Sequence, residues 1–203
     1  MPDRPRLRDL GGGGPGGAPA ALVTIPFLGP EGAARAVAFA ERWQAAVPEA
    51  AFVGIELDPA VDPRLLRHAA SEAAAARAMD SGQLVLFGTG AAGLVAVHSV
   101  LRGLLPGAGV IGLDISGEPE TPPVLASAAV VRLVQHCGED DPRANRLHAL
   151  VDEMRRHELD VRSMVLPSLA RTDPAVAMRA TGTFLVELVA RASRIPPSSG
   201  SRP

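Results

Sequence analysis

Apolar and polar residues alternate along the chain with two different periods. Short apolar runs rich in Val, Ile, Leu and Phe are typical of buried strands, and they cover 21–28, 50–57, 83–88, 109–115, 128–136 and 160–166. Between them, apolar residues recur at the spacing of amphipathic helices. These predicted helices cover 33–46, 62–79, 91–105, 144–158 and 174–193.

This order of elements predicts an α/β fold of three layers, in which helices cover both faces of a doubly wound, mainly parallel sheet. In such sheets ligands bind beyond the carboxyl ends of the strands. The two ends of the chain differ in composition. Residues 1–19 are rich in Gly, Pro and Arg, and residues 195–203 in Pro and Ser. We expect both to be disordered, so that the folded domain spans 20–194.

Composition narrows the range of functions. The net charge of −2 provides no broad basic field for nucleic acid. No Lys occurs, so the chain has neither a Schiff-base amine nor a phosphate-loop lysine. Because Cys137 is the single cysteine, neither an internal disulfide nor a multi-thiolate metal site can form. We expect a cytoplasmic protein with no membrane span, no metal and no cofactor.

A glycine-rich turn between a predicted strand and a predicted helix is the most distinctive local motif. Gly88, Gly90 and Gly93 fit the spacing G-x-G-x-x-G, and Asp114 follows at the end of the next strand. One interpretation is a dinucleotide site of an NAD(P)-dependent oxidoreductase, with Asp114 binding the ribose. Another is that the small residues only allow the strand and the helix to pack closely.

The residues around this turn favour a third interpretation. The segment LFGTGAAGLVAVHSVL is followed by GAGVIGLDISG, then by a strand ending in HCGEDDP, and finally by a helix containing FLVEL. In order and spacing these segments resemble the phospholipase/carboxylesterase branch of the α/β-hydrolases, over roughly residues 21–193. The resemblance implies a nucleophile elbow at the glycine turn and ester hydrolysis by a Ser-His-Asp triad.

The residues at the implied triad positions do not fit that chemistry. Gly90 occupies the position of the nucleophile and has no side chain, whereas Arg171 occupies that of the base and cannot accept a proton at neutral pH. Only the acid, at Asp141, is kept. The oxyanion loop of the family begins His-Gly, where this chain has Pro26 and Phe27. The resemblance therefore implies the fold of a hydrolase without its triad.

Three residues near the turn are possible substitutes. Thr89 carries a hydroxyl next to the elbow, Cys137 carries a thiol at a strand end, and His136 is an adjacent base. The first hypothesis is a compact hydrolase-like protein lacking a lid, which binds a protein partner or a small apolar or acyl ligand and is plausibly a homodimer. The alternatives are an ester hydrolase that uses Thr89 or Cys137, and the oxidoreductase.

Overall fold

The computed structural model describes residues 5–13, 19–58, 63–105, 109–116, 129–138, 141–167 and 174–194. The strands are β1 (Arg6–Gly12), β2 (Ala21–Leu28), β3 (Ala50–Leu57), β4 (Leu84–Thr89), β5 (Gly109–Leu113), β6 (Val130–His136) and β7 (Asp160–Leu166). The α-helices are α1 (Gly29–Gln44), α2 (Pro63–Ala75), α3 (Gly90–Leu101), α4 (Pro142–Arg156) and α5 (Pro174–Ala192). A 3-10 turn, η1 (Ser81–Gln83), leads into β4.

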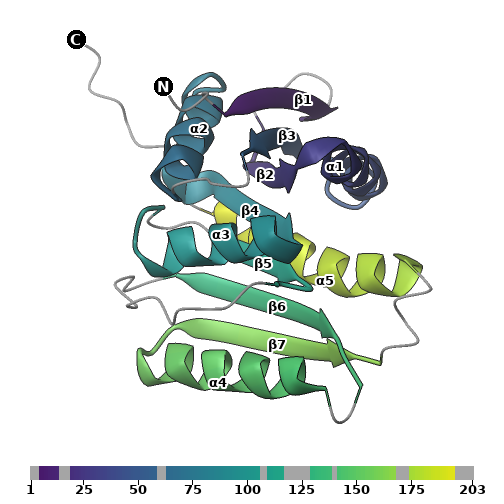
Figure 1. Ribbon diagram of the computed structural model, residues 1–203. Coiled ribbons are helices and arrows are strands. Elements are labelled where there is room, and N and C mark those ends of the chain that lie inside the picture. The colour runs from purple at the N-terminus through teal and green to yellow at the C-terminus, as the bar shows by residue number, and fades with distance from the viewer. Residues whose placement is uncertain are drawn as a thin grey trace.

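The strands form a single seven-stranded sheet in the order β1-β3-β2-β4-β5-β6-β7. All pairs are parallel except β1 with β3, which is antiparallel. Figure 1 shows α2, α3 and α4 on one face of this sheet and α1 and α5 on the other. The predicted three-layer, mainly parallel α/β fold is confirmed.

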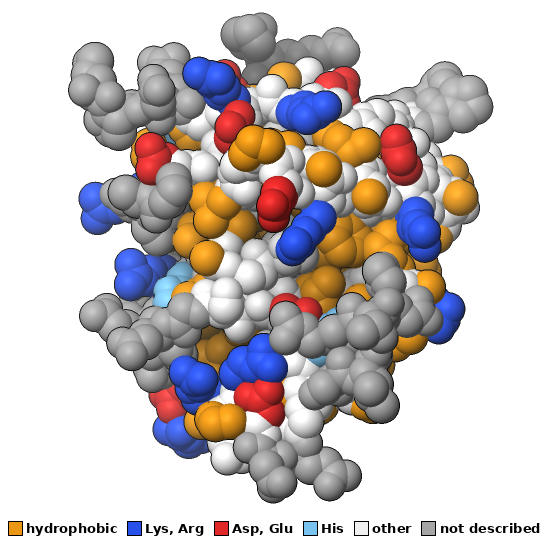
Figure 2. Space-filling model, turned by 45° about the vertical axis from the view of Figure 1, so that its right-hand side comes forward, with side chains coloured by type: hydrophobic (Ala, Val, Ile, Leu, Met, Phe, Trp, Pro, Cys, Tyr) orange, Lys and Arg blue, Asp and Glu red, His pale blue; other side chains and the backbone are white. Residues whose placement is uncertain are grey.

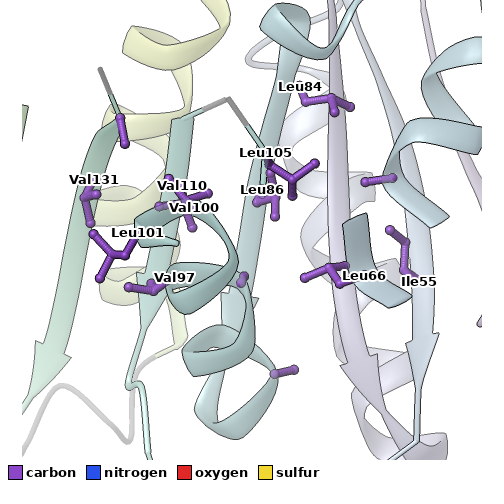
Figure 3. Close-up of a cluster of buried hydrophobic side chains, with 14 of the residues drawn as sticks. Ile55, Leu66, Leu84, Leu86, Val97, Val100, Leu101, Leu105, Val110 and Val131 are labelled. Carbon is purple, nitrogen blue, oxygen red and sulfur yellow. The ribbon is translucent and has the colours of Figure 1, made fainter. Parts of the chain in front are cut away.

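Each face of the sheet has its own hydrophobic core. On the face of α2, α3 and α4, aliphatic side chains of neighbouring strands and helices interlock, as the close-up of this core shows (Figure 3). On the face of α1 and α5, three aromatic rings form the centre. Phe39 and Trp43 of α1 pack against Phe87 of β4, with ring centroids 4.6 to 5.0 Å apart. These contacts hold α1 against β4 at Phe87, directly before the glycine turn.

The prediction that residues 1–19 are disordered is wrong for the segment 6–12, which is β1. Its side chains are mostly exposed, so the segment has no apolar pattern that would reveal a strand. What holds it is backbone pairing with β3, from Arg6 opposite Glu56 to Gly12 opposite Ala51. The predicted tail at 195–203 lies outside the described residues.

Candidate functional site

The glycine turn joins β4 to α3 as a sharp elbow. Gly90, the first residue of α3, has a φ of +56°, in the left-handed region that favours glycine. A Cβ built at Gly88 would lie 2.6 Å from Cα of Gly93, and one at Gly93 would lie 2.6 Å from the carbonyl oxygen of Gly88. These two glycines therefore allow α3 to start directly against β4, and this close approach explains the G-x-G-x-x-G spacing without a bound dinucleotide.

A cleft of about 420 Å³ opens at this elbow, beyond the carboxyl ends of β2, β4 and β5. We call it the elbow cleft; it is lined by Phe27, Leu28, Glu31, Gly32, Arg35, Phe39, Thr89, Gly90, Ala91, Ala92, Leu113, Asp114, Ser116 and Arg143. Side chains of both charges are scattered over the face of the molecule seen in Figure 2, with hydrophobic side chains gathered between them. The elbow cleft combines apolar side chains of β2 and α1 with charged side chains, Glu31, Arg35, Asp114 and Arg143.

Gly90 leaves space in the cleft where the resemblance places a nucleophile. Among the described residues beyond its chain neighbours and its own helix, a Cβ added to Gly90 would meet the Oγ of Ser116, at 3.5 Å. The backbone N–H of Ser116 also donates to the carbonyl oxygen of Gly90, at 3.3 Å. The Ser116 hydroxyl, which was not among the predicted site residues, therefore lies beside Gly90.

Asp141, the implied acid, is bound to its own helix. It is the N-cap of α4 and accepts from the backbone N–H of Arg143, at 2.9 Å. The Arg143 guanidinium donates to both carboxylate oxygens of Asp141. These side-chain hydrogen bonds, followed by the backbone hydrogen bond, lower the pKa of Asp141 to about 2. Arg171, its expected partner, lies outside the described residues.

A second acid, Asp114, holds a histidine at the carboxyl ends of β5 and β6. Its Oδ2 lies 2.9 Å from Nδ1 of His136, and its Oδ1 accepts from the backbone N–H of His136, at 2.7 Å, and from the amide of Gln135, at 3.2 Å. Asp114 has a φ of +49°, which is strained for a residue with a side chain. The predicted ribose acid is therefore engaged by the protein itself.

His136 is buried, with 3 % of its surface exposed. Its Nε2 has no hydrogen-bond partner within the described part of the chain. An unpartnered buried polar atom costs roughly 1–3 kcal/mol, and here it coincides with the strained backbone of Asp114. Sequence reasoning named His136 and Asp114 separately and missed the pair, because their contact depends on which strands are neighbours.

The other proposed substitutes are less suited to nucleophilic chemistry. Burial, followed by the charge of Asp141, raises the pKa of the Cys137 thiol, and this disfavours the reactive thiolate. Thr89 lines the elbow cleft and is the N-cap of α3, although its side chain makes no capping hydrogen bond. Neither residue shares a hydrogen bond with His136 in the described structure.

The described residues contain no group of three or more His, Cys, Asp or Glu side chains placed to hold a metal ion. Within the same ranges, no helix combines the length and apolar character needed to cross a bilayer.

Comparison with known proteins identifies the fold but no family. No family model matches the sequence, and no curated protein is significantly similar to it. Among solved structures, esterase PE8 superposes with a TM-score of 0.73 at 17 % identity, over 92 % of this chain and 100 % of that one. A phospholipase/carboxylesterase from Dyadobacter fermentans DSM 18053 gives a TM-score of 0.56 at 15 % identity, over 80 % and 87 %.

A dienelactone hydrolase-like promiscuous phosphotriesterase, P91, from metagenomic libraries gives a TM-score of 0.58 at 18 % identity, over 87 % of this chain and 88 % of that one. The fold is therefore that of the α/β-hydrolases, as the sequence resemblance implied. At these identities the likeness concerns the fold alone.

Proposed function

We propose that this protein uses an α/β-hydrolase fold to bind a small acyl or apolar ligand in the elbow cleft, without the acyl-enzyme chemistry of a Ser-His-Asp triad. The observation that supports this most strongly is the conformation of Gly90. Its φ of +56° preserves the sharp turn of an elbow, while the reacting side chain is a hydrogen atom. Asp141 further supports the proposal, because its carboxylate is committed to Arg143.

The test is turnover of p-nitrophenyl acetate and butyrate by the full chain. Loss of one triad member typically lowers the rate by at least about four orders of magnitude, so we expect turnover at least that far below the rate of an esterase with an intact triad. Thr89→Ala and Cys137→Ala serve as matched variants. Robust turnover by the native chain that either variant abolishes would contradict the proposal.

A second candidate function is ester hydrolysis at a non-standard site, and the Asp114–His136 pair favours it. Asp114 holds Nδ1 and leaves Nε2 as a proton acceptor, as the acid does in a triad. Because Nε2 is buried and His136 does not line the elbow cleft, this candidate requires the His136 ring to become exposed to the cleft. Water would then attack the ester carbonyl as its proton passes to Nε2, and that proton would return to the departing alkoxide, giving acid and alcohol.

This candidate predicts slow turnover that depends on the His136 side chain. His136→Gln abolishes it, whereas His148→Gln, an exposed histidine on α4, leaves it unchanged. Equal rates in both variants would remove the candidate. No observation favours the oxidoreductase alternative. A protein partner, a homodimer and a cytoplasmic location stay predictions from the sequence.

A further inference from the structure

A second cavity, of about 120 Å³, lies on the face of the sheet covered by α3 and α4. We call it the α4 cavity; it is lined by Leu94, Ile115, Ser116, Gln135, Arg143, Arg146, Leu147 and Leu150. Ser116 and Arg143 also line the elbow cleft, so the two hollows share one wall. The α4 cavity has no role in the chemistry discussed above.

One stripe of α4 forms most of the cavity wall. Arg143, Arg146, Leu147 and Leu150 are spaced i, i+3, i+4 and i+7, so their side chains lie on the same face of the helix. From Arg143 to Leu150 the helix rises about 10 Å. The stripe changes along this length from cationic, at the start of α4, to apolar. The cavity wall is therefore charged near the start of α4 and apolar farther along the helix.

The polar groups gather at the end where α4 begins. Ser116 follows β5 and Gln135 is the second-last residue of β6, so both lie at the carboxyl edge of the sheet. Arg143 lies in the first turn of α4. Gln135 is only 3 % exposed, yet its side chain lines the cavity. Its amide donates one N–H to Asp114 and keeps a second N–H for a ligand. The other end is closed by leucines, of which Leu147 and Leu150 are buried.

Arg143 and Arg146 differ in whether the protein itself provides an ion-pair partner. Arg143 is held by both carboxylate oxygens of Asp141. Among the described residues no carboxylate lies within ion-pair distance of Arg146. The charge of Arg146 nevertheless contributes to lowering the pKa of Asp141. One guanidinium is therefore free to pair with a single negative charge. A dianion would be less well matched, because Asp114 and Asp141 lie near the same end.

We propose that the α4 cavity binds a short-chain aliphatic monocarboxylate. The carboxylate pairs with Arg146 and accepts hydrogen bonds from Ser116 and Gln135, while the chain packs on Leu94, Leu147 and Leu150. This inference goes beyond the proposed function, because it assigns a second ligand to a separate cavity. That cavity shares a wall, Ser116 and Arg143, with the elbow cleft.

Isothermal titration of the full chain with sodium hexanoate tests the proposal. We expect saturable binding at one site, and no binding of 1-hexanol, which has the same chain without the charge. Arg146→Gln removes the free guanidinium, and we expect it to weaken hexanoate binding at least about tenfold. Arg155→Gln is the matched control, because Arg155 lies on α4 outside the cavity with 60 % of its side chain exposed.

Leu94→Phe, which narrows the apolar end from α3, provides an independent variant. We expect it to weaken hexanoate binding more than acetate binding while circular dichroism shows an intact fold. Absence of hexanoate binding, or equal binding by native, Arg146→Gln and Arg155→Gln chains, would overturn the proposal. Such a result with no ester turnover leaves the proposed function standing. Ester turnover with normal hexanoate binding would refute the proposed function alone.

Discussion

At the scale of single residues, Gly90 gives the turn between β4 and α3 its left-handed backbone conformation. A positive φ at the start of α3 costs glycine little, whereas a side chain there is strained. Hydrolases accept that strain in order to expose a nucleophile. In this chain a glycine occupies the turn, and the Ser116 hydroxyl, which follows a neighbouring strand, lies 3.5 Å from where a Cβ of residue 90 would be.

The pKa of Asp141 gives a prediction at this scale. Following the carboxyl carbon by NMR should give a midpoint near pH 2. Its folded pKa lies below the usual value of about 4, so the associated stability is present above pH 4 and is lost as pH falls towards 2. Arg143→Gln should raise the midpoint towards 4, and Arg155→Gln should leave it unchanged. A native midpoint at 4 would show that the Arg143 pair does not form.

At the scale of elements, the packing of α3 against β4 depends on Gly88 and Gly93. Their backbones touch, so any Cβ at either position meets backbone atoms that cannot move independently. This contact fixes where α3 begins and therefore where its first N–H groups point. It also accounts for a glycine inside a helix, where glycine is otherwise unfavourable.

Gly93→Ala should therefore lower the free energy of unfolding by about 1–3 kcal/mol through overpacking, despite the better helix propensity of alanine. Gly182→Ala in α5 is the matched control. Its Cβ would lie 3.4 Å from Nε1 of Trp43, so we expect a change near zero or a slight gain. Urea denaturation of the two variants measures both. Equal stability of the two would contradict the close packing.

Elements were predictable from sequence where burial set the pattern. The apolar runs at 21–28, 50–57 and 160–166 match β2, β3 and β7 to the residue. β1 was missed because its exposed residues obtain their conformation from β3 rather than from their own pattern. The helix predicted to reach residue 105 ends at Leu101. The predicted helix 62–79 ends as α2 at Ala75, where a turn begins.

At the scale of the whole molecule, an ion-pair cluster joins β6, β7 and α5. Arg132 of β6 has a fully buried side chain, and it pairs with Glu187 of α5 at 2.6 Å and with Asp160 of β7 at 3.0 Å. Hydrogen bonds from Arg132 lower the pKa of both carboxyl groups. The sequence alone does not explain why Arg132 interrupts an apolar strand, because its partners Asp160 and Glu187 lie 28 and 55 residues farther along the chain.

Removing both carboxylates should destabilise the protein more than removing the whole cluster. The double variant Asp160→Asn, Glu187→Gln leaves Arg132 buried and unpaired, at a cost of about 3 kcal/mol. Adding Arg132→Met should recover most of that loss. Thermal unfolding at pH 7 measures both variants, and a triple variant no more stable than the double would contradict this account.

The pH dependence supplies an independent check on this cluster. Because the folded pKa values are depressed, the native chain loses the stabilisation as pH falls below about 4, whereas the triple variant lacks these carboxyl groups and shows less of this loss.

The site was predictable only in part. The sequence predicted a sharp turn with no side chain at residue 90, because both depend on residue identity along one segment. It did not show the Asp114–His136 pair, the Ser116 hydroxyl beside Gly90, or the α4 cavity. Each of these depends on which strand ends lie side by side and on the backbone conformation of Asp114.

We propose that the elbow keeps its shape although Gly90 supplies no attacking atom. The most direct measurement is the intact mass of the full chain after exposure to a fluorophosphonate, which forms a covalent adduct with an activated hydroxyl. We predict that the native chain keeps its mass. A stoichiometric adduct on Thr89, Ser116 or any other residue of the elbow cleft would contradict the claim.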